Sequence, residues 1–178
     1  MTSNSGGFSH LAIFDTAQQW LSIIAIITGS TTSIIVPMLS KTISFKKENR
    51  EIFHINIAIN FLISVGIASV FFLFSEEIMS IYGESYIVGS TTLEILSMTS
   101  IFYTISSLFN KYMISHNRLW SVVTNSIFSS GALAIVLIIY VDLTSESLAY
   151  GLLSYYVIST TIYIAHYSNL KLHEYSKK

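Results

Sequence analysis

The chain has 178 residues, of which 52% are hydrophobic and 11% are charged, and its formal net charge is −1. A soluble globular domain carries about a quarter of charged residues, so this composition excludes an ordinary soluble domain, and it indicates no nucleic-acid partner. There is no cysteine, which excludes disulfides, thiolate metal sites and a cysteine nucleophile.

Five apolar stretches follow one another along the chain, at residues 11–39, 52–75, 86–110, 120–141 and 147–168. Each is longer than the roughly 20 residues that a helix needs to cross the hydrocarbon core of a membrane. β-Strands are excluded because the stretches are continuously apolar and about twice as long as the strands of a membrane barrel. The sequence therefore predicts an all-α polytopic membrane protein, with residues 1–178 forming one transmembrane domain of about five helices.

The first stretch carries a polar face on an otherwise apolar helix. Its members are Asp15, Gln18 or Gln19, Ser22, Gly29 and Ser33. Because Gln and Ser form hydrogen bonds between membrane helices and small residues let backbones approach, helix packing is the expected role of this face. Pro37 is expected to close the helix near its cytoplasmic end. The first ten residues contain no Lys or Arg, so this helix is expected to be retained and not cleaved as a signal peptide.

The third stretch contains Glu94 about two turns from its start. A charge at the middle of a bilayer costs about 2.5–3.5 kcal/mol, so this carboxyl group should face protein or a water-filled cavity. A polar row at helical spacing accompanies it, formed by Ser90, Glu94, Ser97, Thr104 and Ser107. Two interpretations stay open. Glu94 is either a cavity-facing carboxylate that couples to a cation or touches substrate, or a packed carboxyl group that is neutral or hydrated near the outer interface.

The fourth stretch carries a third polar row, formed by Ser121, Asn125 and Ser129. The three rows indicate a polar interior, although hydrogen bonds between packed helices explain each row equally well. The five histidines share no helix face, so no metal site is expected. No catalytic constellation and no cofactor are expected either. The candidate substrate or cavity residues are Glu94, Asp15, Gln18, Gln19, Ser97 and Asn125.

The charges between the stretches alternate in sign along the chain. All nine Lys and Arg residues lie in the first gap, the third gap and the tail, at Lys41, Lys46, Lys47, Arg50, Lys111, Arg118, Lys171, Lys177 and Lys178. The second and fourth gaps hold only acids, at Glu76, Glu77, Glu84, Asp142 and Glu146. Short loops rich in Lys and Arg stay in the cytoplasm. The pattern predicts five crossings, with the N-terminus outside and the C-terminus cytoplasmic.

Several short motifs then carry a resemblance to a known family. LAIFDTAQQW (11–20) leads through an apolar run into VPMLS (36–40), and YGE (82–84) and NRLW (117–120) follow downstream. In kind and order these segments resemble the second half of the O-antigen and polysaccharide repeat-unit flippases of the MATE-like exporter superfamily. Ala17, Gln19, Trp20 and Pro37 match the motif of that family. Asp15 and Thr16 depart from it, because they stand where Asn or Ala is usual.

The resemblance implies a transport function. Such flippases move undecaprenyl-diphosphate-linked sugar units across the bacterial inner membrane, by alternating access between two helical lobes around a polar cavity. The implied partners are the lipid bilayer, a lipid-linked oligosaccharide and the other half of the transporter. Because these flippases have about twelve helices, the five stretches correspond to part of the C-terminal lobe. We therefore expect a fragment or half of a full flippase.

One departure concerns positive charge. Family members place basic residues within the cavity to meet the diphosphate, whereas no Lys or Arg lies inside the five predicted stretches. These contacts are then expected from the other half. An alternative function from a different class is a small multispan membrane subunit or assembly factor without a substrate of its own. An intramembrane enzyme acting on lipid-linked sugars ranks last, because the sequence offers no catalytic group of residues.

Overall fold

The computed structural model describes residues 5–33, 46–140 and 144–175. Within these ranges it contains only helices, which confirms the predicted all-α class. They are α1 (Ser5–Ser33), α3 (Lys46–Leu73), α4 (Ser75–Ser80), the 3₁₀ helix η1 (Glu84–Gly89), α5 (Ser90–Ser115), α6 (Leu119–Ile139) and α7 (Ser145–Tyr175).

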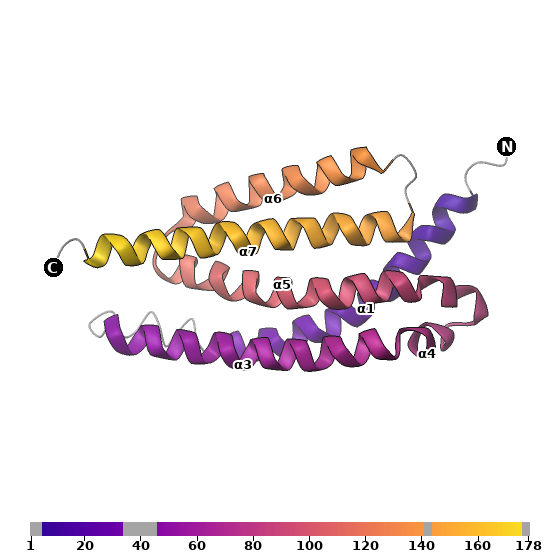
Figure 1. The fold of residues 1–178 in the computed structure, drawn as a ribbon, viewed down its shortest axis with the longest axis horizontal. Coiled ribbons are helices and arrows are strands. Elements are labelled where there is room, and N and C mark those ends of the chain that lie inside the picture. The colour runs from indigo at the N-terminus through magenta and orange to yellow at the C-terminus, as the bar shows by residue number, and fades with distance from the viewer. Residues whose placement is uncertain (1–4, 34–45, 141–143, 176–178) are drawn as a thin grey trace.

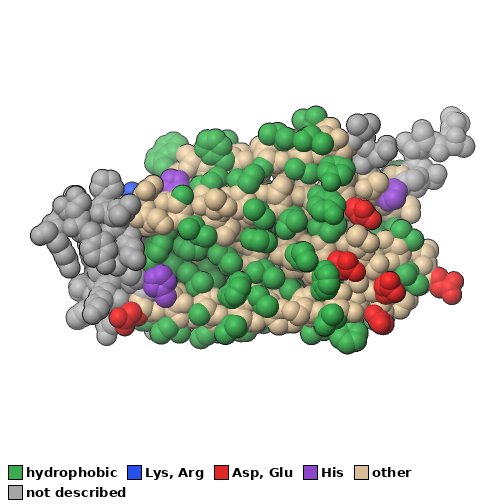
Figure 2. Space-filling view, in the orientation of Figure 1, with side chains coloured by type: hydrophobic (Ala, Val, Ile, Leu, Met, Phe, Trp, Pro, Cys, Tyr) green, Lys and Arg blue, Asp and Glu red, His purple; other side chains and the backbone are tan. Residues whose placement is uncertain are grey.

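Five of these helices are long and apolar enough to cross a membrane. The candidate spans are Gly7–Ser30, Glu51–Leu73, Glu84–Ser115, Leu119–Ile139 and Ser145–Asn169. Large apolar side chains such as Leu62 and Ile138 are exposed on the outer faces of the helices, and they cover much of the surface in Figure 2. A surface of this kind is stable in contact with lipid. The chain is therefore a multi-pass membrane protein, as its apolar stretches predict.

The long helices form an elongated bundle in which successive helices run in alternate directions, with α1 crossing the bundle obliquely (Figure 1). α5 is the central helix, because it contacts α1, α3 and α7 along the bundle. α6 lies at the edge and contacts mainly α7. Its buried residues are Asn125 and Ser129, both polar. The fully buried residues of the edge helix are therefore polar, while Leu133 and Leu137 are half-buried and pack next to Gly151 of α7.

Two apolar clusters lie toward opposite ends of the bundle. The first joins α1, α4, α5 and α7, and it includes Ile13, Met79 and Leu96. A side chain on Gly89 would lie 2.5 Å from Cγ2 of Ile13 and 2.7 Å from Cε of Met79, so this glycine lets the helices approach closely. The second cluster joins α3, α5 and α7 through Phe53, Phe109, Met113 and Tyr163.

The helix ends differ from those that the apolar stretches predict. α1 begins at Ser5, before residue 11, and the predicted end with Pro37 lies outside the described residues. α3 ends at Leu73, and the segment after it, predicted as an external turn, contains α4 and η1. The last stretch was predicted to end at residue 168, but α7 continues to Tyr175. A helix ends where capping or a breaker ends it and not where its apolar run ends, so α7 can continue into polar residues.

The end of α5 changes one prediction about charge. The third stretch was predicted to stop at residue 110, but α5 continues to Ser115 and the candidate span includes Lys111. The candidate span, which is longer than the hydrocarbon core of a bilayer, therefore includes one basic residue near its end. The turn that follows contains Asn117 at a φ of 56°, the left-handed conformation that Asn tolerates.

Candidate functional site

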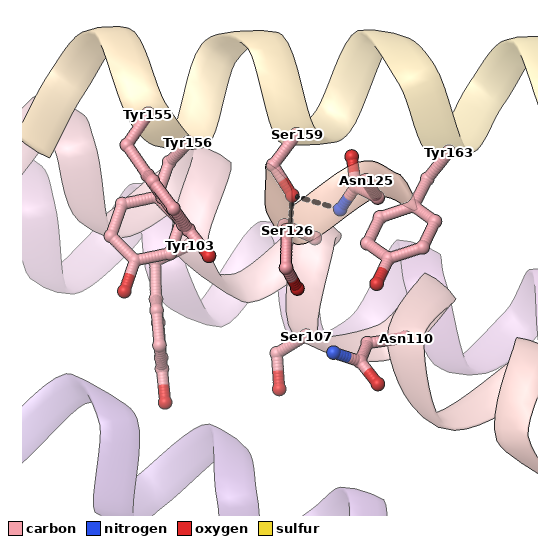
Figure 3. Close-up of a pocket in the computed structure, with 10 residues that line it drawn as sticks. Tyr103, Ser107, Asn110, Asn125, Ser126, Tyr155, Tyr156, Ser159 and Tyr163 are labelled. Carbon is pink, nitrogen blue, oxygen red and sulfur yellow. Dashed lines mark hydrogen bonds between the residues drawn. The ribbon is translucent and has the colours of Figure 1, made fainter. Parts of the chain in front are cut away.

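A cavity of about 200 Å³ lies among α5, α6 and α7 (Figure 3). Its wall consists of four tyrosines, four serines and two asparagines: Tyr103, Ser106, Ser107, Asn110, Asn125, Ser126, Tyr155, Tyr156, Ser159 and Tyr163. None of these side chains is charged. All three helices are candidate membrane spans, so this is an uncharged polar cavity within an apolar bundle.

Helical spacing brings these side chains to one place. The four lining residues of α5 recur at intervals of three and four along one face of the helix, from Tyr103 to Asn110. The lining residues of α7 lie on the opposing face between Tyr155 and Tyr163. The helices satisfy their own backbone groups, so the side chains are free to bond to one another or to a ligand. Ser126 of α6 is exposed, so the cavity is open on that side.

A buried hydrogen-bonded junction joins the three helices at the cavity wall. The hydroxyls of Ser106 on α5 and Ser159 on α7 are 2.6 Å apart. Asn125 on α6 donates from Nδ2 to Oγ of Ser159 at 2.7 Å, as the dashed lines in Figure 3 mark. All three side chains are at most 5% exposed. Because unpaired polar groups are costly in an apolar setting, this junction fixes how the three helices meet.

Two buried polar side chains of the wall lie close to one another. The amide oxygen of Asn125 and the hydroxyl of Tyr163 meet no partner of good hydrogen-bond geometry among the described residues, but the Asn125 and Tyr163 side chains are near enough to interact with each other. Tyr163 is only 1% exposed. An unsatisfied buried polar atom costs about 1–3 kcal/mol. A small adjustment of these two side chains, or a bound polar molecule, would complete their hydrogen bonds.

Tyrosine rings give the cavity flat apolar faces beside its polar atoms. The rings of Tyr103 and Tyr156 are 5.3 Å apart at 89°, and those of Tyr155 and Tyr156 are 4.9 Å apart at 81°. Edge-to-face packing of this kind holds aromatic rings in place. The wall therefore combines fixed ring faces with hydroxyl and amide groups. This combination suits an uncharged molecule that carries both C–H surface and many hydroxyls.

Among the residues predicted from the sequence, Asn125 lines this cavity and Glu94 does not. Glu94 is half-buried on α5, and its Oε1 accepts a hydrogen bond from Oγ of Ser75 at 2.9 Å. Ser75, at the start of α4, is 4% exposed. Ser97 is buried and donates to the backbone oxygen of Glu94 at 2.7 Å, within the same helix. These two predicted residues therefore hold local structure at the other end of α5.

The predicted residues of α1 also lie away from the cavity wall. Asp15 and Gln19 are exposed, and Gln18 is half-buried. Sequence reasoning missed the tyrosines of the wall. The available signal was their depth, because Tyr155, Tyr156 and Tyr163 lie inside a span, whereas membrane tyrosines are enriched at the interfaces.

Comparison with known proteins adds no family to this description. No protein-family model, no curated protein and no solved structure matches the chain. The fold and the cavity therefore carry the functional argument.

Proposed function

We propose that this protein takes part in translocating undecaprenyl-diphosphate-linked O-antigen or polysaccharide repeat units across the bacterial inner membrane, as a fragment or half of a full flippase. The observation that carries the proposal is the uncharged cavity lined by tyrosine, serine and asparagine inside three candidate spans. Sugar rings present C–H faces that stack on aromatic rings and hydroxyls that bond to amide and hydroxyl groups. The cavity offers both kinds of contact.

The position of the cavity along the helices supports uptake from one side of the membrane. Asn125 and Ser126 lie about two turns from the start of α6, and Asn110 lies in the last turns of α5. The cavity is therefore closer to the α5–α6 turn, which contains Arg118, than to the opposite end of these helices. In the proposed topology this turn is cytoplasmic, on the side from which the sugar units start.

The size of the cavity supports a role as part of a larger site. Its volume of about 200 Å³ is below the roughly 300–1,000 Å³ of a typical small-molecule pocket. It would hold one sugar ring and not a whole repeat unit. The remaining sugars would then contact another lobe, as alternating access between two lobes requires.

The test replaces one cavity hydroxyl without changing the shape of the wall. Tyr156→Phe in the intact gene is expected to lower export of surface polysaccharide about fivefold at unchanged protein level, because one hydrogen bond contributes about 1 kcal/mol. Tyr150→Phe is the matched control on α7, since Tyr150 is exposed and stacks on Tyr140 outside the cavity. The readouts are surface polysaccharide and lipid-linked sugar retained in the cytoplasmic leaflet.

Deletion of the gene gives the outcome that would reject this function. Loss of surface polysaccharide with accumulation of lipid-linked units supports the flippase. Normal surface polysaccharide in the deletion strain contradicts the flippase function. It favours the alternative, a multispan membrane subunit or assembly factor without a substrate of its own.

A further inference from the structure

The outward face of α1 carries polar side chains in the middle of a candidate membrane span. Asp15, Gln19 and Ser22 are exposed, and they recur at intervals of four and three residues, so they form one row on the helix. The candidate span runs from Gly7 to Ser30, which puts Gln19 at its centre. A carboxylate or a carboxamide is costly at this depth unless a polar group meets it.

The outer faces of α3 and α6 differ from this row. Their exposed side chains are mostly large and apolar, and the exposed hydroxyls of Ser69 and Ser126 donate to backbone oxygens of their own helices. The side chains of Asp15 and Gln19 make no hydrogen bond or ion pair with the described residues. Their row is therefore unsuited to lipid, and we expect it to meet polar groups of another membrane helix.

The row is complementary to a copy of itself. A carboxamide carries both donors and an acceptor, so two Gln19 side chains can bond to each other across a twofold axis. In a parallel helix pair each side chain also contacts positions one turn away on the facing helix. Gln19 of one copy can then donate from its N–H to the carboxylate of Asp15 on the other. A twofold axis requires such a self-complementary patch.

The shape of α1 permits a second copy to approach closely. Ser22, Gly29 and Ser30 are small, and a Cβ on Gly29 would have no neighbour within 4 Å outside its own helix backbone. Small residues of this kind let membrane helices approach. α1 is oblique to the bundle (Figure 1), so a twofold axis along the bundle makes the two α1 helices cross. The polar row can therefore meet its copy at the crossing point.

We propose that two copies of this chain associate through the α1 row of Asp15, Gln19 and Ser22, side by side and in the same orientation in the membrane. The row supplies an amide donor, a carboxylate acceptor and a small side chain where the two helices cross. The interface does not rest on the proposed function. It gives the polar face of α1 the packing role that its residue types predict, but against a second copy and not against the helices of its own chain.

Disulfide crosslinking tests the interface directly, because the chain has no cysteine of its own. Ser22→Cys is suitable, since the Ser22 hydroxyl donates to the backbone oxygen of Gln18 in the same helix. In proteoliposomes at low protein density, oxidation should convert the 19.9 kDa chain to a species of twice that mass. Ser69→Cys on α3 and Ser130→Cys on α6 are exposed within candidate spans, and these controls should stay monomeric.

The contribution of the amide is measured separately. Gln19→Leu, added to the Ser22→Cys protein, should weaken association about threefold or more, because hydrogen bonds between the helices are lost. The readout is the dimer fraction as the protein-to-lipid ratio is lowered. Gln19→Asn keeps an amide and should retain most of the association. Ser69→Leu places the same apolar side chain on α3 and should leave it unchanged.

Three results would overturn the proposal. Equal crosslinking of the Ser22→Cys, Ser69→Cys and Ser130→Cys proteins would show that the disulfides report random collision. Unchanged association of the Gln19→Leu protein at a normal protein level would show that the row does not hold two copies together. A photoreactive residue at position 22 that crosslinks in cells to a different membrane protein, and not to a second copy, would assign this face to that other partner.

Discussion

The carboxylate of Glu94 connects the short helix α4 to the central helix α5. It accepts a hydrogen bond from the hydroxyl of Ser75, a residue that is buried at the start of α4. Of the two interpretations that the sequence left open, this contact favours the packing role. A half-buried carboxylate that bonds to a serine hydroxyl does not need a cation or a substrate to explain its position.

Substitution at Glu94 separates charge from packing. Glu94→Gln keeps an oxygen acceptor for Ser75, so protein level and surface polysaccharide should both remain normal. Glu94→Leu leaves the buried hydroxyl unsatisfied and should lower the free energy of unfolding by about 1–3 kcal/mol, measured by thermal denaturation in one detergent. Loss of surface polysaccharide in Glu94→Gln at normal protein level would instead assign the charge of Glu94 to transport.

Among the helices, α6 depends most on a few polar contacts. It lies at the edge of the bundle, and its buried residues are Asn125 and Ser129. Ser159 on α7 bonds to both Asn125 and Ser106, so one hydroxyl links α6, α7 and α5. Since lipid is as apolar as the outer face of α6, apolar contact alone gives this helix little preference for the bundle.

Removing that hydroxyl should loosen the edge helix. Ser159→Ala leaves the Asn125 amide and the Ser106 hydroxyl without this partner. We expect a loss of about 0.6 kcal/mol, the average for polar contacts between membrane helices, and at most about 1.7 kcal/mol. Ser154→Ala is the control, because Ser154 donates only to the backbone oxygen of Gly151 in its own helix. Equal unfolding temperatures for the two variants, measured in one detergent, would show that the junction does not hold α6.

The helices follow from the sequence more readily than their ends do. Continuous apolar runs predict five spans because only a helix satisfies its backbone within lipid. The apolar stretches predict neither the short helix α4 (Ser75–Ser80) nor the continuation of α5 past residue 110. Both depend on local hydrogen bonding and tertiary contact. Because α5 extends to Ser115, Lys111 lies within this helix, although the apolar stretches place it in the gap that follows.

The cavity was predictable only in part. Asn125 was a candidate because a buried amide in an apolar helix needs a partner. Tyr103, Tyr156 and Tyr163 were not, because tyrosine is compatible with a core, an interface or a binding site. Which of these applies depends on the faces that α5 and α7 turn toward each other. The facing surfaces are set by packing along the whole length of both helices, and no local sequence pattern predicts them.

At the scale of the molecule, charge is separated along the bundle. Glu76, Glu77 and Glu84 belong to α4 and the start of η1, and Glu146 begins α7, while Arg118 lies in the α5–α6 turn. Figure 2 shows most acidic side chains gathered near the end that contains α4. Because the helices alternate in direction, each turn returns the chain to one of two ends. Among the described residues, the four acids of α4, η1 and the start of α7 therefore lie at one end of the bundle and Arg118 at the other.

This separation predicts how the protein lies in the membrane. Loops with Lys and Arg stay in the cytoplasm, so the end with Arg118 should be cytoplasmic and the end with Glu84 should be periplasmic. In intact cells, a membrane-impermeant maleimide should label Glu84→Cys and not Arg118→Cys, while permeabilised cells should show both. A thiol at Ser130, within a candidate span, serves as the control for reagent that enters the bilayer. Labelling of Arg118→Cys in intact cells would reverse the orientation, and the end of the cavity nearer the α5–α6 turn would then face away from the cytoplasm, which contradicts the proposed uptake from the cytoplasmic side.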